Sequence, residues 1–263
     1  MASNTKTIAI ANQKGGVGKS TTVQNIGAGL SRIGKKVLLI DMDPQSNLTT
    51  IAGAVSDAED KMTVTMLEVL CEEKSINAGI QHLEQYDIVP ASMFLASIDG
   101  RITNSLSRPY RLQKAISDLK EHYDYILIDT PPALGTLTSN ALIAAQSVII
   151  PAQADILSLQ GVSQLYETIN AAREHANPSL EIAGIVFTRY NARTKLTQEI
   201  SKLFTGAATQ MKTKLFDARI REATAVKEAQ AGRVDIFTYD KNCNPAKDYA
   251  ALIEEAFGEK VEL

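Results

Sequence analysis

A short segment near the start of the chain combines glycines, lysines and hydroxyl side chains: Lys14-Gly15-Gly16-Val17-Gly18-Lys19-Ser20-Thr21. An apolar run at residues 7–12 precedes it and a helix pattern at 20–33 follows, so the segment should join a strand to a helix. Backbone N–H groups in such a loop can surround phosphates, and the helix N-terminus adds its dipole. We predict a P-loop in which Lys19 contacts the β- and γ-phosphates, Ser20 binds Mg²⁺ and Thr21 contacts the α-phosphate.

The loop departs from the general P-loop pattern at its first glycine. The pattern G-x-x-x-x-G-K-[ST] requires glycine at position 13, but this position is Gln13, and a second lysine follows, Lys14. This form resembles the deviant Walker A motif, whose first lysine reaches across a nucleotide-sandwich dimer to the phosphates of the partner. A cation supplied in trans would offset charge on the transferring phosphoryl group. Lys14 is therefore a candidate catalytic residue; the alternative is a solvated loop lysine.

Carboxylates follow two further apolar runs. Asp41 and Asp43 come after residues 37–40, and Asp129 comes after residues 125–128. Continuous apolar runs are typical of parallel strands covered on both faces, and ligands bind beyond the carboxyl ends of such strands. We therefore expect the loop and these carboxylates to share one site, with Asp129 as a Walker B acid near Mg²⁺ through water. One or both of Asp41 and Asp43 would orient the attacking water or enter the metal shell.

The elements that must position these residues alternate along the chain. Strands are predicted at residues 7–12, 37–40, 86–89, 125–128, 147–150 and 182–187, and helices at 20–33, 110–122, 138–145, 159–175 and 249–257. This alternation predicts an α/β fold with a mostly parallel, twisted sheet and helices on both faces, as in P-loop NTPases. Residues 1–263 are expected to form a single ATPase domain, because there is no linker or low-complexity tract. No N-terminal helix-turn-helix domain is expected, because the loop begins within the first fifteen residues.

Charge is unevenly distributed along the chain. Residues 189–233 carry a net charge of +6, and the remainder carries −9. Such asymmetry is typical of a local surface that binds a polyanion. No apolar run approaches the roughly 20 residues of a membrane span. Cys71, Cys243 and the three histidines have no metal-ligand spacing, so the cysteines are interpreted as structural thiols of a cytoplasmic protein.

Five segments together resemble the ParA/Soj branch of partition ATPases, over nearly the whole chain: residues 12–19, 39–47, 123–135, 158–165 and 223–230. The resemblance implies an ATP- and Mg²⁺-dependent homodimer that binds double-stranded DNA without sequence preference. It also implies slow hydrolysis that is stimulated by a ParB-type centromere-binding partner. Such a protein would be cytoplasmic, associated with the nucleoid, and would not bind membrane.

The resemblance also assigns roles by matching position. Lys14 would be the trans lysine, Lys19 the phosphate lysine and Ser20 the Mg²⁺ ligand. Asp43 would position the attacking water and is also a candidate for the metal shell. Asp129 would be the Walker B acid.

Three arginines of the basic segment are candidate DNA contacts. Arg193 matches a DNA-contact arginine of the family, and either Arg219 or Arg221 would be the second. Contacts of this kind bind phosphates, which makes binding independent of base sequence and sensitive to salt.

Three alternatives share part of this pattern. A MinD-type membrane ATPase has the same deviant loop, but it ends in a basic amphipathic helix, whereas residues 248–260 are mainly acidic at their polar positions. An iron–sulfur reductase related to nitrogenase iron protein needs cysteines at a dimer seam, which Cys71 and Cys243 do not match. A positioning ATPase for protein cargo would use the same chemistry, so the cargo, and a plasmid or chromosomal host, are left open.

Overall fold

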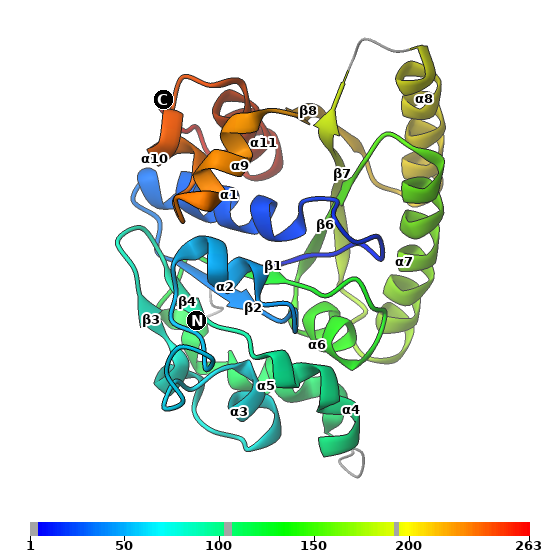
Figure 1. Cartoon of the computed structure of the whole chain (residues 1–263). Coiled ribbons are helices and arrows are strands. Elements are labelled where there is room, and N and C mark those ends of the chain that lie inside the picture. Colours follow the sequence, from blue (N-terminus) through cyan, green and yellow to red (C-terminus); the bar gives the residue numbers. More distant parts are fainter. Residues whose placement is uncertain (1–4, 103–106, 192–194) are drawn as a thin grey trace.

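The computed structural model describes residues 5–102, 107–191 and 195–263. Its strands form one eight-stranded sheet in the order β3-β4-β2-β5-β1-β6-β7-β8 (Figure 1). The strands are β1 (Lys6–Ile10), β2 (Val37–Asp41), β3 (Gln81–His82), β4 (Asp87–Val89), β5 (Tyr125–Asp129), β6 (Ser147–Ala152), β7 (Glu181–Tyr190) and β8 (Leu215–Arg221). Neighbouring strands pair in parallel, apart from the antiparallel pair β3 and β4. The mostly parallel sheet predicted from the sequence is confirmed.

Helices cover both faces of this sheet. They are α1 (Lys19–Arg32), α2 (Asn47–Ala52), α3 (Met66–Cys71), α4 (Ile98–Arg101), α5 (Arg111–Ala115), α6 (Thr136–Ala144), α7 (Ile156–His175), α8 (Lys195–Gln210), α9 (Thr224–Ala231), α10 (Ile236–Asp240) and α11 (Asn244–Phe257). Short 3₁₀ turns are η1 (Ile76–Gly79), η2 (Met93–Ser97), η3 (Arg108–Tyr110) and η4 (Asp118–Glu121). Figure 1 shows α7 and α8 side by side on one face, with α1 and α11 on the other.

The continuous apolar runs explain why both faces are covered. Side chains of a strand alternate between the two faces of its sheet. In β2, Leu38 and Ile40 pack into the core beneath α3, α5, α6 and α7, whereas Val37 and Leu39 pack into the core beneath α1 and α11. Both sets are buried, so neither face of the central strands meets water.

The helix predicted at residues 110–122 is wrong as one element. The chain forms η3, the short helix α5 and η4 in succession. The Ser117 hydroxyl donates to the carbonyl oxygen of Lys114 and to the carboxylate of Asp118, so local side-chain bonds compete with the helix there. The apolar side chains of Leu112 and Leu119 still reach the core, which is the signal that resembled a longer helix.

The sequence predicts a C-terminal helix at residues 249–257. This helix is confirmed as α11, which begins earlier, with Pro245 in its first turn. Tyr249, Leu252 and Ile253 are buried against β8 and α1. Among the described residues, no helix is both long and apolar enough to cross a membrane.

Candidate nucleotide-binding site

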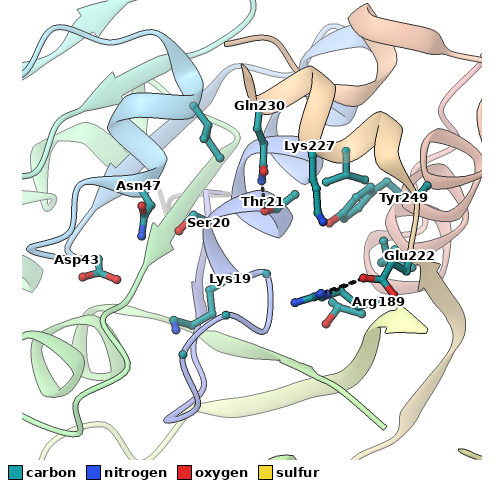
Figure 2. A pocket seen from close by; sticks show the side chains of 18 of the residues that line it. Lys19, Ser20, Thr21, Asp43, Asn47, Arg189, Glu222, Lys227, Gln230 and Tyr249 are labelled. Carbon is teal, nitrogen blue, oxygen red and sulfur yellow. Dashed lines mark hydrogen bonds and ion pairs between the residues drawn. The ribbon is translucent and has the colours of Figure 1, made fainter. Parts of the chain in front are cut away.

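A cavity of about 510 Å³ lies where β1, β2, β5, β7 and β8 end. Its walls come from the glycine-rich loop, from the segment after β2, from Pro132 after β5 and from the ends of β7 and β8. Figure 2 shows Lys19, Ser20 and Thr21 facing this space, with Asp43 and Asn47 on one side and Arg189 and Glu222 on the other. The size suits a nucleotide.

The loop is held open by backbone geometry and by two distant side chains. Gly16 has φ of 73° and Gly18 has φ of 80°, a left-handed region that glycine adopts without strain. The hydroxyl of Thr188, buried in β7, donates to the carbonyl oxygen of Val17 at 2.8 Å. The Gln153 amide donates to the carbonyl oxygen of Gly16 at 3.3 Å. Sequence reasoning missed both anchors, because each lies more than a hundred residues away from the loop.

Lys19 begins α1 and is largely buried beside two carboxylates. Burial lowers its pKa, and the charges of Asp129 and Asp43 partly offset that effect. Ser20 and Thr21 follow it along the cavity wall. The positions of these side chains fit the predicted phosphate site.

Asp41, which ends β2, and Asp43, which follows it, have different surroundings. Asp41 is fully buried; one oxygen accepts the Asp43 N–H at 3.0 Å, and the other accepts the N–H and hydroxyl of Thr49 at 2.8 and 2.7 Å. Burial raises the pKa of Asp41 to about 6, against these hydrogen bonds. Asp41 therefore ties α2 to β2, whereas Asp43 lines the cavity. Of the two candidates, only Asp43 is placed to meet a ligand.

Asp129 ends β5 with a fully buried carboxylate. Neither oxygen has a well-formed hydrogen bond within the described part of the chain. Burial and the neighbouring charge of Asp41 raise its pKa well above the usual value, and the Ser20 hydroxyl and Lys19 only partly offset this. An unpartnered, buried carboxylate beside a serine hydroxyl fits Mg²⁺, which usually takes one or two protein oxygens together with phosphates and waters. The described residues contain no cluster of three or more metal-ligating side chains.

Replacing Asp129 by asparagine should stabilise the protein when Mg²⁺ and nucleotide are absent. The raised pKa means that the folded state holds a proton more tightly than the unfolded state, so stability is present at low pH and is lost as pH rises through the folded pKa. At pH 8 the melting temperature of the variant should therefore exceed that of the wild type. The increase should be about 2–4 °C for each kcal/mol by which the buried charge destabilises the folded wild type. The difference should shrink near pH 4, which calorimetry can measure. Equal melting temperatures at pH 8 would contradict this account.

Lys14 belongs to the same loop, but its ammonium group is held outside the cavity. It contacts Asp155 at 2.7 Å and Ser158 at 3.2 Å, at the start of α7, and Gln153 at 3.3 Å, just after β6. Partial burial alone would raise the pKa of Asp155, but the bonds from Lys14 and from the Ser158 N–H lower it. Lys14 is not among the described residues that line the cavity.

Two of the candidate DNA-contact arginines, Arg219 and Arg221, lie near the end of β8. The Arg219 guanidinium stacks over the Tyr190 ring, 4.8 Å from its centroid, and donates to the Tyr190 hydroxyl at 2.6 Å. Arg221 donates to both carboxylate oxygens of Asp248, at 2.5 and 2.9 Å. Arg193 lies outside the described residues.

A glycine-rich loop at the start of α1, with acids at the carboxyl ends of β2 and β5, defines a P-loop ATPase. A family model described as an AAA domain matches residues 5–182. The chain is 38% identical over 256 residues to the sporulation initiation inhibitor protein Soj of Bacillus subtilis. The matched region covers 95% of this chain and 97% of that protein. The chain belongs to the ParA/Soj family of chromosome- and plasmid-partition ATPases.

One further relative agrees with this assignment, and one solved structure shares the fold. The chain is 36% identical over 254 residues to the chromosome partitioning protein ParA of Caulobacter vibrioides, covering 95% of this chain and 93% of that protein. Among solved structures, cobyrinic acid a,c-diamide synthase from Mycobacterium smegmatis, with bound ATP analog and magnesium, superposes with a TM-score of 0.82. The two chains are 32% identical, with 98% of each covered.

Proposed function

We propose that this partition ATPase binds ATP and Mg²⁺, closes face to face with a second copy and holds DNA without sequence preference. Hydrolysis, slow alone and stimulated by a ParB-type partner, then releases the DNA. The protein would act in the cytoplasm on the nucleoid. Similarity to the Soj and ParA proteins supports the partition role. The position of Lys14 is the observation on which the dimer mechanism rests.

Lys14 is a loop lysine that does not face the phosphate site of its own chain. Its ammonium lies instead at the start of α7, beside Ile156 and Leu157, whose side chains are 57% and 69% exposed. Exposed aliphatic side chains beside a cation suit an interface that a second copy would cover. In such a dimer, Lys14 would leave Asp155 and contact the phosphates bound by the partner.

The remaining site residues divide the chemistry among them. The loop N–H groups and Lys19 would bind the β- and γ-phosphates, and Mg²⁺ held near Ser20 and Asp129 would supply neutralising charge. Asp43 would accept a hydrogen bond from water and aim its oxygen at the γ-phosphorus. As the water oxygen bonds to that phosphorus, the bond to the bridging oxygen would break and release ADP, and the proton lost by water would pass to Asp43. The cation of Lys14 from the second chain would offset the charge on the phosphoryl group.

A DNA mobility-shift experiment with ATP, ADP and no nucleotide tests this function. The shift should require ATP with Mg²⁺ and should weaken between two salt concentrations, because phosphate contacts release counterions. The same shift under all three nucleotide conditions would contradict nucleotide-controlled DNA binding.

The packing of helix α11 argues against the alternative of a membrane-bound, MinD-like ATPase. The apolar face of α11 is already buried against β8 and α1, so it is not available to lie on lipid. Pelleting with anionic vesicles and ATP should therefore leave the protein in solution, and clear pelleting would favour the MinD-like alternative.

Of the two arginines on β8, we propose Arg219 as the DNA contact. Arg221 is neutralised by Asp248, whereas the partners of Arg219 found among the described residues, Tyr190 and Phe187, are uncharged. Arg219→Ala should weaken ATP-dependent DNA binding and reduce the slope of log affinity against log salt by about one unit for each phosphate that is no longer bound. ATP binding should not change.

Arg221→Ala is the matched comparison. It would leave Asp248, which is only 8% exposed, without its cation, so it should lower the melting temperature more than Arg219→Ala does. If Arg219→Ala kept the wild-type DNA affinity and salt slope, Arg219 would not be a DNA contact.

A further inference from the structure

One face of helix α9 borders the cavity at the end away from Asp43. Val226, Lys227 and Gln230 line the cavity, and residues three or four apart lie on the same side of a helix. Figure 2 shows the Lys227 and Gln230 side chains reaching from α9 toward Thr21 and Tyr249. The phosphate-binding motif contains neither side chain, so α9 adds polar groups to a site that the motif does not predict.

Gln230 determines how the Thr21 hydroxyl can act. Its amide nitrogen donates to the hydroxyl oxygen of Thr21 at 2.8 Å. A hydroxyl that accepts this bond still has its own proton to donate. Because Thr21 lines the cavity, that proton can be donated to a ligand oxygen. Gln230 is thus a positioning residue for Thr21.

Lys227 brings a positive charge to the same end of the cavity. The nearby cations Arg189 and Arg221 are each paired, with Glu222 and Asp248. No ion pair of Lys227 is found among the described residues, so its charge is available to a ligand. An unpaired ammonium group at a cavity wall favours an anion there.

The order of groups along the cavity indicates which anion this is. Lys19 and Asp43 lie where the terminal phosphates would bind. Thr21, in the same first turn of α1, lies further from Asp43 along the cavity. The nucleoside must occupy the space beyond Thr21, toward Glu222 and Tyr249. Lys227 approaches between these two regions, where the phosphate attached to the nucleoside would lie.

We propose that α9 completes the α-phosphate site, with Lys227 binding an α-phosphate oxygen and Gln230 holding the Thr21 hydroxyl as a second donor to that phosphate. This rests on the proposed function in one respect, that the cavity binds adenine nucleotides. It adds a cation that binds the phosphate common to ATP, ADP and AMP, whereas Lys19 serves the terminal phosphates.

Calorimetric titration of the full chain with ADP, AMP and adenosine tests the proposal. Lys227→Ala should lower the affinity for ADP and for AMP by about tenfold, which corresponds to the loss of one charge-assisted hydrogen bond. The affinity for adenosine should not change. Gln230→Ala should weaken the same two ligands by about threefold, since one neutral hydrogen bond is affected. Lys247→Ala, which removes an exposed lysine of α11 outside the cavity lining, is the matched control and should change none of the three affinities.

The outcomes separate this proposal from the function on which it rests. Equal weakening of AMP and adenosine by Lys227→Ala would place the ammonium on the nucleoside and overturn the proposal, as would unchanged ADP binding. A lowered melting temperature for Gln230→Ala with no selective loss of ADP and AMP would mean that Gln230 is only structural, which also overturns it. Wild-type protein that bound no nucleotide would refute the proposed function itself.

Discussion

Lys14→Ala should retain ATP binding but lose about 10³-fold or more of the partner-stimulated hydrolysis rate, the effect of removing a phosphoryl-stabilising cation supplied in trans. The loop N–H groups and Lys19 remain in the variant, so the nucleotide still has its principal contacts. The measurement is phosphate release in the presence of DNA and the ParB-type partner, with nucleotide affinity determined in parallel. Hydrolysis at the wild-type rate would show that Lys14 has no trans role.

Asp155→Asn is a useful companion variant. It removes the charge that holds the Lys14 ammonium at 2.7 Å while leaving an oxygen to cap α7. Lys14 would then be released at lower cost, so we expect dimers with ATP at lower protein concentration and an undiminished hydrolysis rate. Loss of hydrolysis in this variant would indicate that Asp155, and not only Lys14, is needed for the chemistry.

Asp43→Ala should lower hydrolysis by about 10²- to 10⁴-fold, the usual worth of a positioned general base. ATP should still bind and the dimer should still close, so the variant should remain on DNA after excess competitor DNA is added. Filter binding over time measures this retention. A variant that stayed monomeric with ATP, or that left DNA as fast as the wild type, would contradict the assignment of Asp43 to the attacking water.

Asp41→Ala provides the contrast two residues away. Its carboxylate accepts hydrogen bonds from Thr49 and does not line the cavity. The Thr49 hydroxyl in turn accepts the N–H of Ala91 at 3.0 Å. Removing it would leave buried donors without partners, which typically costs about 1–3 kcal/mol for each group. We therefore expect a lower melting temperature for Asp41→Ala and little change for Asp43→Ala.

Much of the sheet could be predicted because its central strands are buried on both faces. Runs such as residues 37–40 and 125–128 contain only aliphatic and aromatic side chains, so these strands and the polar residues at their ends can be recognised from the sequence. Strand β8 was missed for the opposite reason. It is the last strand of the sheet, and exposed Asp217 alternates with buried Phe216, so its composition resembles a loop.

The site was predictable as far as its local motifs extend. Loop residues from Gly15 to Thr21 line one cavity with Asp43, and Asp129 is buried near Lys19, because parallel strands bring their carboxyl ends to one edge. The roles of these residues stay predictions. What joins them is not local. Asp155, 141 residues from Lys14, and Asp248, 27 residues from Arg221, decide which cations are free, and no spacing along the chain encodes those pairs.

The ion pair between Lys14 and Asp155 also has a kinetic consequence. Under the proposed mechanism, an isolated chain would hold the cation needed for hydrolysis against Asp155, where it would not reach the nucleotide of its own chain. The rate of ATP hydrolysis per chain should therefore rise in proportion to total protein, and the total rate with its square, until most chains are paired. Wherever partition complexes or DNA gather many copies, turnover would rise, while dilute molecules elsewhere would keep their ATP.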